Sequence, residues 1–166
     1  MDVAFEEAEN ALARSEVPIG CAIVYKNEVI ARNGNRVNEF KDATRHAEML
    51  CLEALYRWAE DRNLDYNLVY KDCEIFVTVE PCIMCCCALR CFSKYPPVKV
   101  AFSARNQRFG GCGTLIGYDR EEIDEWPELR VEETTGGERA IYLLKSFYTI
   151  ENVNAPEEMR KVKTNL

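Results

Sequence analysis

The hydrophobic residues at the start of the chain first follow a helical period and then an extended one. Apolar side chains recur every three or four positions from Asp2 to about Glu16, which predicts an amphipathic helix that ends before Pro18. Two runs rich in strand-forming residues follow, Gly20 to Tyr25 and Val29 to Ala31. The polar residues between these runs favour a turn, so the pair predicts a β-hairpin. Polar residues 33–44 then predict a loop.

A second long helix and a central strand are predicted in the middle of the chain. The segment from His46 to Trp58 has a helical pattern, and the loop before it offers Asp42 and Thr44 as candidate caps. Glu74 to Val79 is a compact run of mainly β-branched residues and predicts a strand. A proline follows this strand, and because proline is favoured in the first turn of a helix, we expect a helix over Cys82 to Ser93.

The last third of the chain continues the alternation of strands and helices. It predicts a strand from Val98 to Phe102, a flexible glycine-rich loop at 110–113, a short edge strand from Leu129 to Glu132 and a helix from Glu138 to Tyr148. Residues 151–166 lack periodicity and predict an extended or disordered tail. The alternation as a whole is typical of an α/β fold with right-handed crossovers between parallel strands.

The size and composition of the chain fit one domain. With 166 residues and 48% hydrophobic content it can bury a conventional core, and we expect a single domain over residues 1–150 followed by the tail 151–166. No apolar stretch approaches the roughly 20 residues that cross a bilayer, so no membrane attachment is predicted. The net charge of −7 and the isoelectric point near 4.9 have the wrong sign for unaided binding to a polyanion. A nucleic-acid substrate would therefore require a basic surface from elsewhere.

The cysteines indicate a reducing compartment. There are nine of them, an odd number, and four lie between positions 85 and 91. No secretory segment opens the chain, and a disulfide framework would need paired and spaced cysteines. We therefore expect the protein in the cytoplasm or the nucleus.

One cluster has the residue types of a metal site. Residues 46–48 (His-Ala-Glu) begin one predicted helix, residues 81–85 (Pro-Cys-Ile-Met-Cys) begin another, and His46 is the single histidine of the chain. Two thiolates and one imidazole suit zinc, and three protein ligands leave the fourth tetrahedral position open for water, as in catalytic sites. Helix starts also favour the thiolate over the thiol. We therefore predict that His46, Cys82 and Cys85 bind zinc.

Glu48 is the predicted proton carrier. It lies two residues from His46 in the same first helical turn, close to the metal yet free of it, where a partly desolvated carboxyl can change its protonation state. Bound zinc lowers the pKa of its water from about 15.7 towards roughly 7, which prepares an attack on an amidine carbon such as C6 of adenine. The pattern H-x-E followed by P-C-x-x-C is a signature of zinc-dependent nucleobase deaminases.

Other interpretations of these residues stay open at this point. Cys86 lies one helical turn after Cys82, so spacing alone leaves it as a rival ligand or as the fourth ligand of a closed structural zinc site. A C-x-x-C pair after a strand also occurs in thioredoxin-like redox proteins, which need neither histidine nor zinc. Asn35, in the polar loop, could be no more than a loop cap.

The segments around the cluster resemble the tRNA adenosine deaminase family. The similar segments span almost the whole chain and comprise residues 16–20, 44–49, 77–85, 104–106, 110–113 and 151–156. Together they most resemble the catalytic chain of the heterodimeric members, which convert adenosine to inosine at the tRNA wobble position. The resemblance implies Zn²⁺ as cofactor and a cytidine deaminase-like fold, a three-layer α/β/α sandwich with a central mixed five-stranded sheet.

The same resemblance implies roles for single residues and a partner. Asn35 is expected to hydrogen-bond the flipped base, while Val17 and the backbone of Ala47 and Pro81 shape its pocket. The implied tRNA contacts lie in the loop from 105 to 113 and in the tail, and are Arg105, Asn106, Arg108, Arg160, Lys161 and Lys163. The implied partner is a catalytically inactive paralogous subunit that supplies much of the tRNA-binding surface. This agrees with the acidic charge of the present chain, which disfavours tRNA binding by this chain alone.

Two other functions compete with tRNA editing. A deaminase of a free nucleoside, nucleotide or nucleobase, of cytidine, deoxycytidylate or guanine type, would share the zinc chemistry, and the acidic charge favours it. A non-enzymatic zinc scaffold or a thiol redox protein is the alternative from another class. Glu48 argues against the scaffold, and the extended similar segments favour tRNA.

Overall fold

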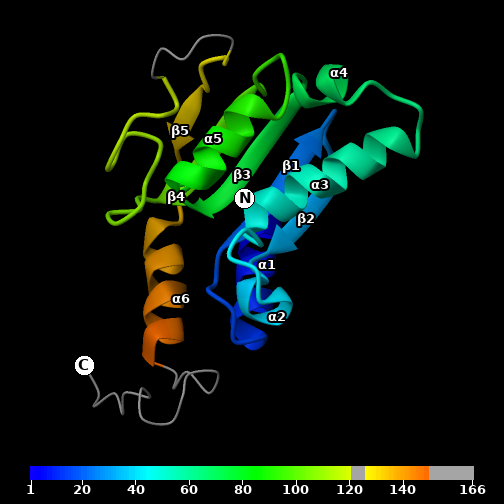
Figure 1. The fold of residues 1–166 in the computed structure, drawn as a ribbon. Coiled ribbons are helices and arrows are strands. Elements are labelled where there is room, and N and C mark those ends of the chain that lie inside the picture. Colours follow the sequence, from blue (N-terminus) through cyan, green and yellow to red (C-terminus); the bar gives the residue numbers. More distant parts are fainter. Residues whose placement is uncertain (121–125, 150–166) are drawn as a thin grey trace.

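The computed structural model of the chain describes residues 1–120 and 126–149 (Figure 1). The predicted tail 151–166, with Arg160, Lys161 and Lys163, lies outside the described residues. Within the described part, no helix combines the length and the apolar character needed to cross a membrane.

Five strands form one mixed sheet (Figure 1). They are β1 (Gly20–Tyr25), β2 (Glu28–Gly34), β3 (Cys73–Val79), β4 (Lys99–Ala104) and β5 (Val131–Glu133), and their order in the sheet is β2-β1-β3-β4-β5. β1 pairs antiparallel with β2 and β3, whereas β3 with β4 and β4 with β5 pair in parallel. The predicted hairpin and the mixed five-stranded sheet are confirmed.

Helices cover both faces of this sheet (Figure 1). They are α1 (Asp2–Ala13), α2 (Val37–Phe40), α3 (Ala47–Glu60), α4 (Tyr66–Tyr70), α5 (Ile83–Cys91) and α6 (Gly137–Thr149). α3 contacts α5 on one face, and α1 contacts α6 on the other. The arrangement is the predicted three-layer α/β/α sandwich.

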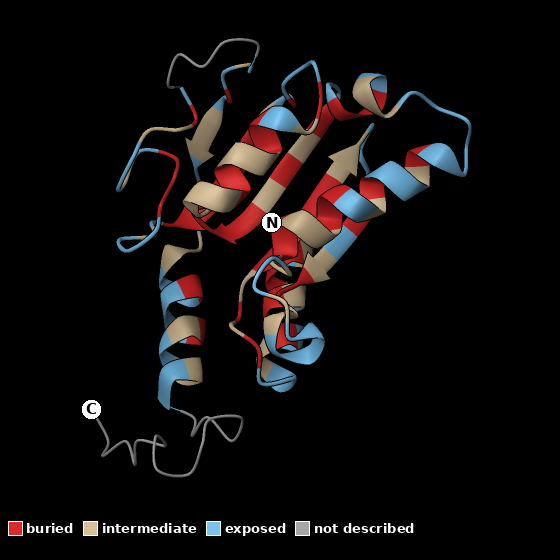
Figure 2. Ribbon diagram, in the orientation of Figure 1, coloured by how far each residue is buried: buried red, intermediate tan, exposed pale blue. Residues whose placement is uncertain are grey.

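The core lies on both sides of the sheet and holds the layers together (Figure 2). Between the sheet and the α3–α5 layer, fully buried side chains include Ile23, Leu55, Ile75, Val77 and Leu89. On the opposite face a smaller cluster joins α1 to α6 and includes Phe5, Ala8, Ala140 and Leu143. Burying one such aliphatic or aromatic side chain contributes about 1.5–3 kcal/mol, so the packing of these faces holds the helices against the sheet.

Strand direction brings the functional segments to one edge of the sheet. Because β1 runs against both of its neighbours, β2, β3 and β4 all point the same way. Their carboxyl ends, at Gly34, Val79 and Ala104, therefore share one edge. Ligands of α/β sheets bind at this edge.

Several boundaries differ from the predictions. α1 ends at Ala13, short of the predicted Glu16, and the chain then turns through Ser15, whose φ of 59° is left-handed. The predicted loop 33–44 contains the short helix α2, and a further short helix, α4, was not predicted; both are too brief to show a hydrophobic period. The predicted loop 110–113 is anchored, because Gly110, Gly111 and Cys112 are buried and hydrogen-bonded.

Candidate active site

The starts of α3 and α5 meet at the carboxyl edge of the sheet. His46 is the N-cap residue of α3, Cys82 is the N-cap residue of α5, and Cys85 lies in the first turn of α5. Nδ1 of His46 lies 3.6 Å from Sγ of Cys82 and 3.5 Å from Sγ of Cys85. The two helix starts thus bring the three predicted ligands together, with all ligand atoms within 4.8 Å of one another.

The spacing of these atoms fits a zinc ion. Tetrahedral zinc with a Zn–S bond of about 2.3 Å and a Zn–N bond of about 2.1 Å separates sulfur from nitrogen by about 3.6 Å. The observed separations of 3.5 and 3.6 Å agree with this value. The ligand set is open on one side, where His46 and Cys82 line a pocket. An open three-ligand set is the arrangement of catalytic rather than structural zinc.

The two thiols are electrostatically different. A hydrogen bond with Cys85 and another with His46 lower the pKa of Cys82 to about 4 despite its burial. The same contact with Cys82, together with burial, raises the pKa of Cys85 above its usual value. Both thiols would give up their protons to a bound zinc ion, because zinc binds cysteine as the thiolate.

Glu48 lies beside the cluster without belonging to it. Its side chain is 3% exposed and sits in the first turn of α3. Burial, followed by the charge of Cys82, raises the pKa of Glu48 to about 7. Because the residue also lines the pocket, its carboxyl can exchange a proton with a bound molecule.

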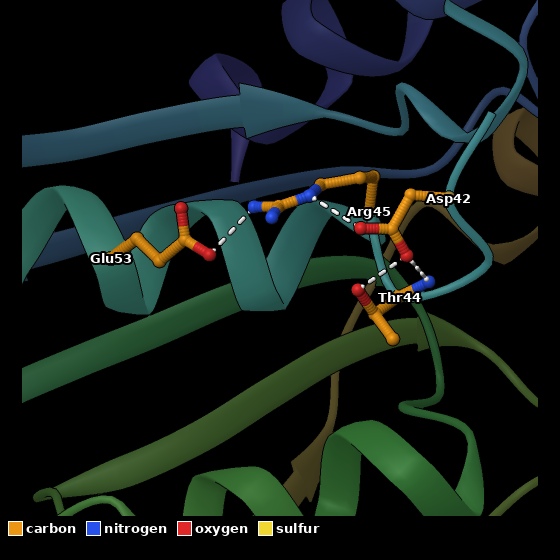
Figure 3. Close-up of polar contacts among 4 residues, drawn as sticks. All are labelled: Asp42, Thr44, Arg45 and Glu53. Carbon is orange, nitrogen blue, oxygen red and sulfur yellow. Dashed lines mark hydrogen bonds and ion pairs between the residues drawn. The ribbon is translucent and has the colours of Figure 1, made fainter. Parts of the chain in front are cut away.

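Asn35 fixes the start of α3 from the end of β2. Its Oδ1 accepts a hydrogen bond of 2.9 Å from the backbone N–H of Ala47, and the residue is 3% exposed. A helix start leaves several N–H groups without intrahelical partners, and Asn35 satisfies one of them. The prediction that Asp42 or Thr44 caps α3 is wrong. Oδ1 of Asp42 instead accepts hydrogen bonds from the N–H and the hydroxyl of Thr44, within the loop before the helix (Figure 3).

Exposed charges hold the loop in front of His46 (Figure 3). Arg45 pairs with Asp42 at 3.0 Å and with Glu53 on α3 at 2.7 Å. Its guanidinium also lies 5.9 Å from the centre of the Phe40 ring. Solvent and salt weaken such exposed pairs, so this network orients the loop without adding much stability.

The cluster opens into a pocket of about 400 Å³. Predicted residues that line it around the metal ligands are Val17, Asn35, His46, Glu48 and Cys82. The predicted pocket residues Ala47 and Pro81 are buried and lie outside its lining. Their backbone groups are already engaged, since the N–H of Ala47 bonds Asn35 and the carbonyl of Pro81 accepts from Gly111 at 2.9 Å.

The mouth of the pocket is formed by the loop after β4 and by α6. The predicted Arg105, Asn106 and Arg108 line this mouth. Gln107 and Phe109 also line the pocket; they belong to the predicted loop 105–113 but were not singled out, whereas Leu144 and Tyr148 on α6 were not predicted at all. Two signals could have found them: Phe109 is an apolar residue beside a cation in a polar loop, and Leu144 and Tyr148 share one helix face. Phe109 is 61% exposed, as suits a side chain that meets a ligand.

Cys86 packs in the hydrophobic core. It is fully buried, like Cys85, but it belongs to the core cluster that also contains Cys112. Of the described residues, only His46, Cys82 and Cys85 form a group whose ligand atoms are close enough to hold a metal ion. The sequence had left Cys86 as a rival ligand, and its packing removes it from that role.

The fold and the site are those of a zinc-binding deaminase domain. A family model described as the cytidine and deoxycytidylate deaminase zinc-binding region matches residues 1–101. The chain is 42% identical to tRNA-specific adenosine deaminase 2 of Xenopus tropicalis over 164 residues, which are 98% of this chain and 95% of the relative. The chain therefore belongs to the tRNA-specific adenosine deaminase family.

Other known proteins are similar to this chain in sequence or share its fold. The tRNA-specific adenosine deaminase subunit tad2 of Schizosaccharomyces pombe is 36% identical over 162 residues, which are 97% of this chain and 39% of the relative. A structure from a study of A-to-I editing by tRNA:A34 deaminases superposes with a TM-score of 0.72 at 27% identity, covering 87% of this chain and 97% of that one. A guanine deaminase of Nitrosomonas europaea, at 18% identity and a TM-score of 0.64, shares the fold over 88% of this chain and 81% of its own.

Proposed function

We propose that this chain catalyses the zinc-dependent hydrolytic deamination of adenosine to inosine at the wobble position of tRNA anticodons. The observation that carries the proposal is the open His46–Cys82–Cys85 cluster beside a buried glutamate, in a chain 42% identical to a tRNA-specific adenosine deaminase. The similar solved structure comes from work on deaminases of the same tRNA position.

The residues around the cluster divide the chemistry between them. When bound, zinc supplies a water molecule that ionises near neutral pH. Glu48 would take one proton from the attacking water and deliver it to the ring nitrogen, and would then carry the second proton, from the new hydroxyl on the ring carbon, to the amine that leaves as ammonia. Its enclosure beside the cluster keeps solvent from exchanging these protons between the steps. The net reaction consumes one water and converts the amidine carbon of adenine into a carbonyl.

The base is held by residues around the cluster. Because Oδ1 of Asn35 is occupied by the N–H of Ala47, its Nδ2 group is the part that can donate a hydrogen bond to the base. Val17 and Ile19 supply apolar contact at the pocket wall. A pocket of about 400 Å³ has room for one flipped nucleobase with its sugar at the mouth.

Nucleotides on either side of the base would meet the pocket mouth. Arg105 and Arg108 are the cations there, and Asn106 shares the same loop. Arg105 already pairs with Glu133 at 2.7 Å, but both side chains are 47% exposed, so a phosphate can compete for it. Phosphate contacts of this kind supply most of the affinity of proteins for nucleic acids.

The acidic charge of the chain supports a heterodimer with a basic, catalytically inactive paralogue. The net charge of −7 disfavours tRNA binding by this chain alone, and the fission yeast relative is named as a subunit. A groove of about 440 Å³ between α3 and α5 offers a partner an apolar surface. Its apolar lining includes Met49, Leu52, Ala88 and Phe92, with Glu53 and Arg57 at its edge.

Inosine formation in tRNA tests the function. The zinc-loaded chain, alone and mixed with its paralogous subunit, is incubated with tRNA over a range of salt concentrations, and free adenosine, cytidine and guanine are assayed in parallel. We expect inosine at the wobble position, produced mainly by the mixture. Turnover of a free base or nucleoside without tRNA editing would overturn the proposal, and full activity of the isolated chain at physiological salt would refute the heterodimer.

The remaining assignments are narrower. We propose that the deaminase domain spans residues 1–150, with 151–166 as a tail that reaches the tRNA through Arg160, Lys161 and Lys163. We also propose that the chain works in the cytoplasm or the nucleus, because all nine cysteines are free thiols.

A further inference from the structure

Glu80 is a buried carboxylate with no assigned role. It lies between the end of β3 and the ligand Cys82, and it is 1% exposed. Its own N–H donates a hydrogen bond of 2.7 Å to the carbonyl of Ala104 at the end of β4. The residue therefore sits at the junction between the metal-binding turn and the loop that follows β4.

Both carboxylate oxygens of Glu80 accept backbone hydrogen bonds from that loop. Oε2 accepts from the N–H of Asn106 at 3.0 Å. Oε1 accepts from the N–H of Cys112 at 3.0 Å and from the N–H of Thr114 at 3.1 Å. One side chain thus gathers three N–H groups from the two ends of residues 105–114, which we call the wall segment.

Further contacts press the wall segment against the metal-binding turn. The N–H of Ile83 donates to the carbonyl of Phe109, and the N–H of Gly111 donates to Pro81, each at 2.9 Å. A Cβ atom on Gly110 would stand 2.7 Å from the Glu80 carboxyl and 2.6 Å from the carbonyl oxygen of Asn106. The segment fits closely around the carboxylate, although its residues 105 and 107–109 are exposed at the pocket mouth.

We propose that Glu80 is a positioning residue that holds the wall segment in the conformation that receives the nucleotides next to the edited base. The proposal rests on the function proposed above. Glu80 does not touch the reacting atoms; it sets where Arg105, Arg108 and Phe109 stand relative to the metal. A carboxylate suits this task because it offers acceptors at both oxygens and no donor, as three converging N–H groups require.

Glu80→Gln isolates this role. Glutamine keeps one acceptor oxygen but turns the other into an NH₂ group, which would face a backbone N–H and lose at least one hydrogen bond. Glu16→Gln is the matched control, because Glu16 is also 1% exposed but, among the described residues, accepts a single backbone hydrogen bond, from the N–H of Glu39 at 2.8 Å. An amide can satisfy that single donor.

The measurement compares backbone amide hydrogen exchange and kinetics of the full zinc-loaded chain, with the paralogous subunit present for turnover. In Glu80→Gln we expect exchange at Asn106, Cys112 and Thr114 to quicken by about tenfold or more, the scale of one lost charge-assisted hydrogen bond. We expect KM for tRNA to rise by about tenfold with kcat within about threefold, because the wall segment contributes uniform binding. Zinc content and the Glu16→Gln control should match the unmodified chain.

A second pair of variants covers the case in which Glu80→Gln does not fold. Gly110→Ala pushes the wall segment off the carboxylate and should reproduce the faster exchange and the higher KM. Gly117→Ala adds a Cβ in the same loop with its nearest neighbour at 3.4 Å, an ordinary contact, and should do neither.

Three results would overturn the proposal: unchanged exchange in both Glu80→Gln and Gly110→Ala, a fall in kcat with unchanged KM, or loss of zinc with faster exchange throughout the core. Exchange is measured without tRNA, so it still decides the anchoring role if the unmodified chain forms no inosine. The absence of inosine would count against the proposed function instead.

Discussion

The floor of the pocket is largely enclosed and braced by hydrogen bonds, whereas its rim is exposed and carries charged and aromatic side chains. We define the floor as Asn35, His46, Glu48 and Cys82, and the rim as Arg105, Arg108, Phe109 and Tyr148. Asn35 and Glu48 are each 3% exposed, while Phe109 and Tyr148 are 61% and 56% exposed.

This difference between floor and rim matches two tasks, catalysis at the floor and tRNA binding at the rim. Attack on one ring carbon needs reacting groups held close to their final positions, which buried and hydrogen-bonded side chains provide. Binding of a long, charged polymer needs reach, charge and aromatic surface, which exposed side chains provide. We therefore expect changes at the floor to lower zinc binding or kcat, and changes at the rim to raise KM for tRNA.

The largest effect is expected at the metal. Cys85→Ala removes a ligand and should leave the purified chain with little or no zinc, because the remaining two ligands bind the ion far more weakly. Cys86→Ala is the matched control from the next position, whose thiol packs in the core, and it should keep one zinc per chain. Elemental analysis and X-ray absorption measure zinc content and the ligand set of one nitrogen and two sulfurs. Zinc loss in both variants would show that Cys86 takes part.

The next largest effect is expected at Glu48. Glu48→Gln keeps the size of the side chain but removes the proton carrier, so kcat should fall by about 10²–10⁴-fold. Because Glu48 stands outside the metal cluster, zinc content and unfolding midpoint should stay close to those of the unmodified chain. Single-turnover inosine formation and zinc analysis are the measurements. If the variant lost its metal, Glu48 would be a ligand and the assigned role would be wrong.

Asn35 should show an intermediate effect that separates two tasks. Asn35→Asp keeps an oxygen for the N–H of Ala47 but replaces the amide donor, so the fold should survive while kcat/KM falls by about 10–100-fold. Asn35→Ala loses both groups and should also destabilise the chain by about 1–2 kcal/mol. Denaturant unfolding and kinetics with tRNA distinguish the two. Equal stability of the two variants would argue that the Ala47 hydrogen bond does not matter.

Most of the floor could be predicted from the sequence because His46, Glu48 and Cys82 occupy fixed positions in short motifs, whereas the role of Asn35 was expected only from the family resemblance. His46 and Glu48 are two residues apart, Cys82 and Cys85 are three apart, and each pair begins a helix after a recognisable loop or strand. Metal chemistry restricts which residue types can occupy such positions. Spacing alone could not decide whether Cys86 also binds the metal. Cys85 and Cys86 are both fully buried, and only tertiary structure places Cys85 beside His46 and Cys82 and Cys86 in the hydrophobic core.

The rim was predicted in part, because it depends on contacts between segments far apart in the chain. Tyr148 shares a helix face with Leu144, which the sequence shows, but that this face borders the pocket depends on the packing of α6 against β3, β4 and α1. Glu80 looked like part of a motif, yet its hydrogen bonds to residues 106–114 arise from tertiary structure. The caps of α3 were mispredicted for the same reason, since Asn35 comes from a neighbouring strand.

At the rim, Arg108→Ala should change binding rather than chemistry. Loss of one phosphate contact should weaken tRNA binding severalfold at low salt and reduce the slope of log K against log salt by about 1. The parallel variant Phe109→Ala should weaken binding without changing that slope, because stacking on an aromatic ring is not ionic. Binding titrations at several salt concentrations give both numbers. A fall in kcat for either variant would erase the proposed division between floor and rim.

The smallest effect, a small change in stability, is expected for the exposed ion pairs of Arg45, next to the floor residue His46. Arg45 precedes the predicted ligand His46 and is paired with Asp42 and Glu53 (Figure 3). All three paired side chains are at least 30% exposed. Glu53→Gln breaks one of these pairs, and the unfolding midpoint should fall by less than about 2 °C because water and salt already screen it. The difference should shrink further in high salt, where the Debye length drops to about 3 Å. Thermal unfolding at low and high salt provides the measurement, with zinc content as a check on His46. A large, salt-independent loss of stability or of zinc would mean that the exposed network, and not the buried hydrogen bond between Asn35 and Ala47, places the start of α3.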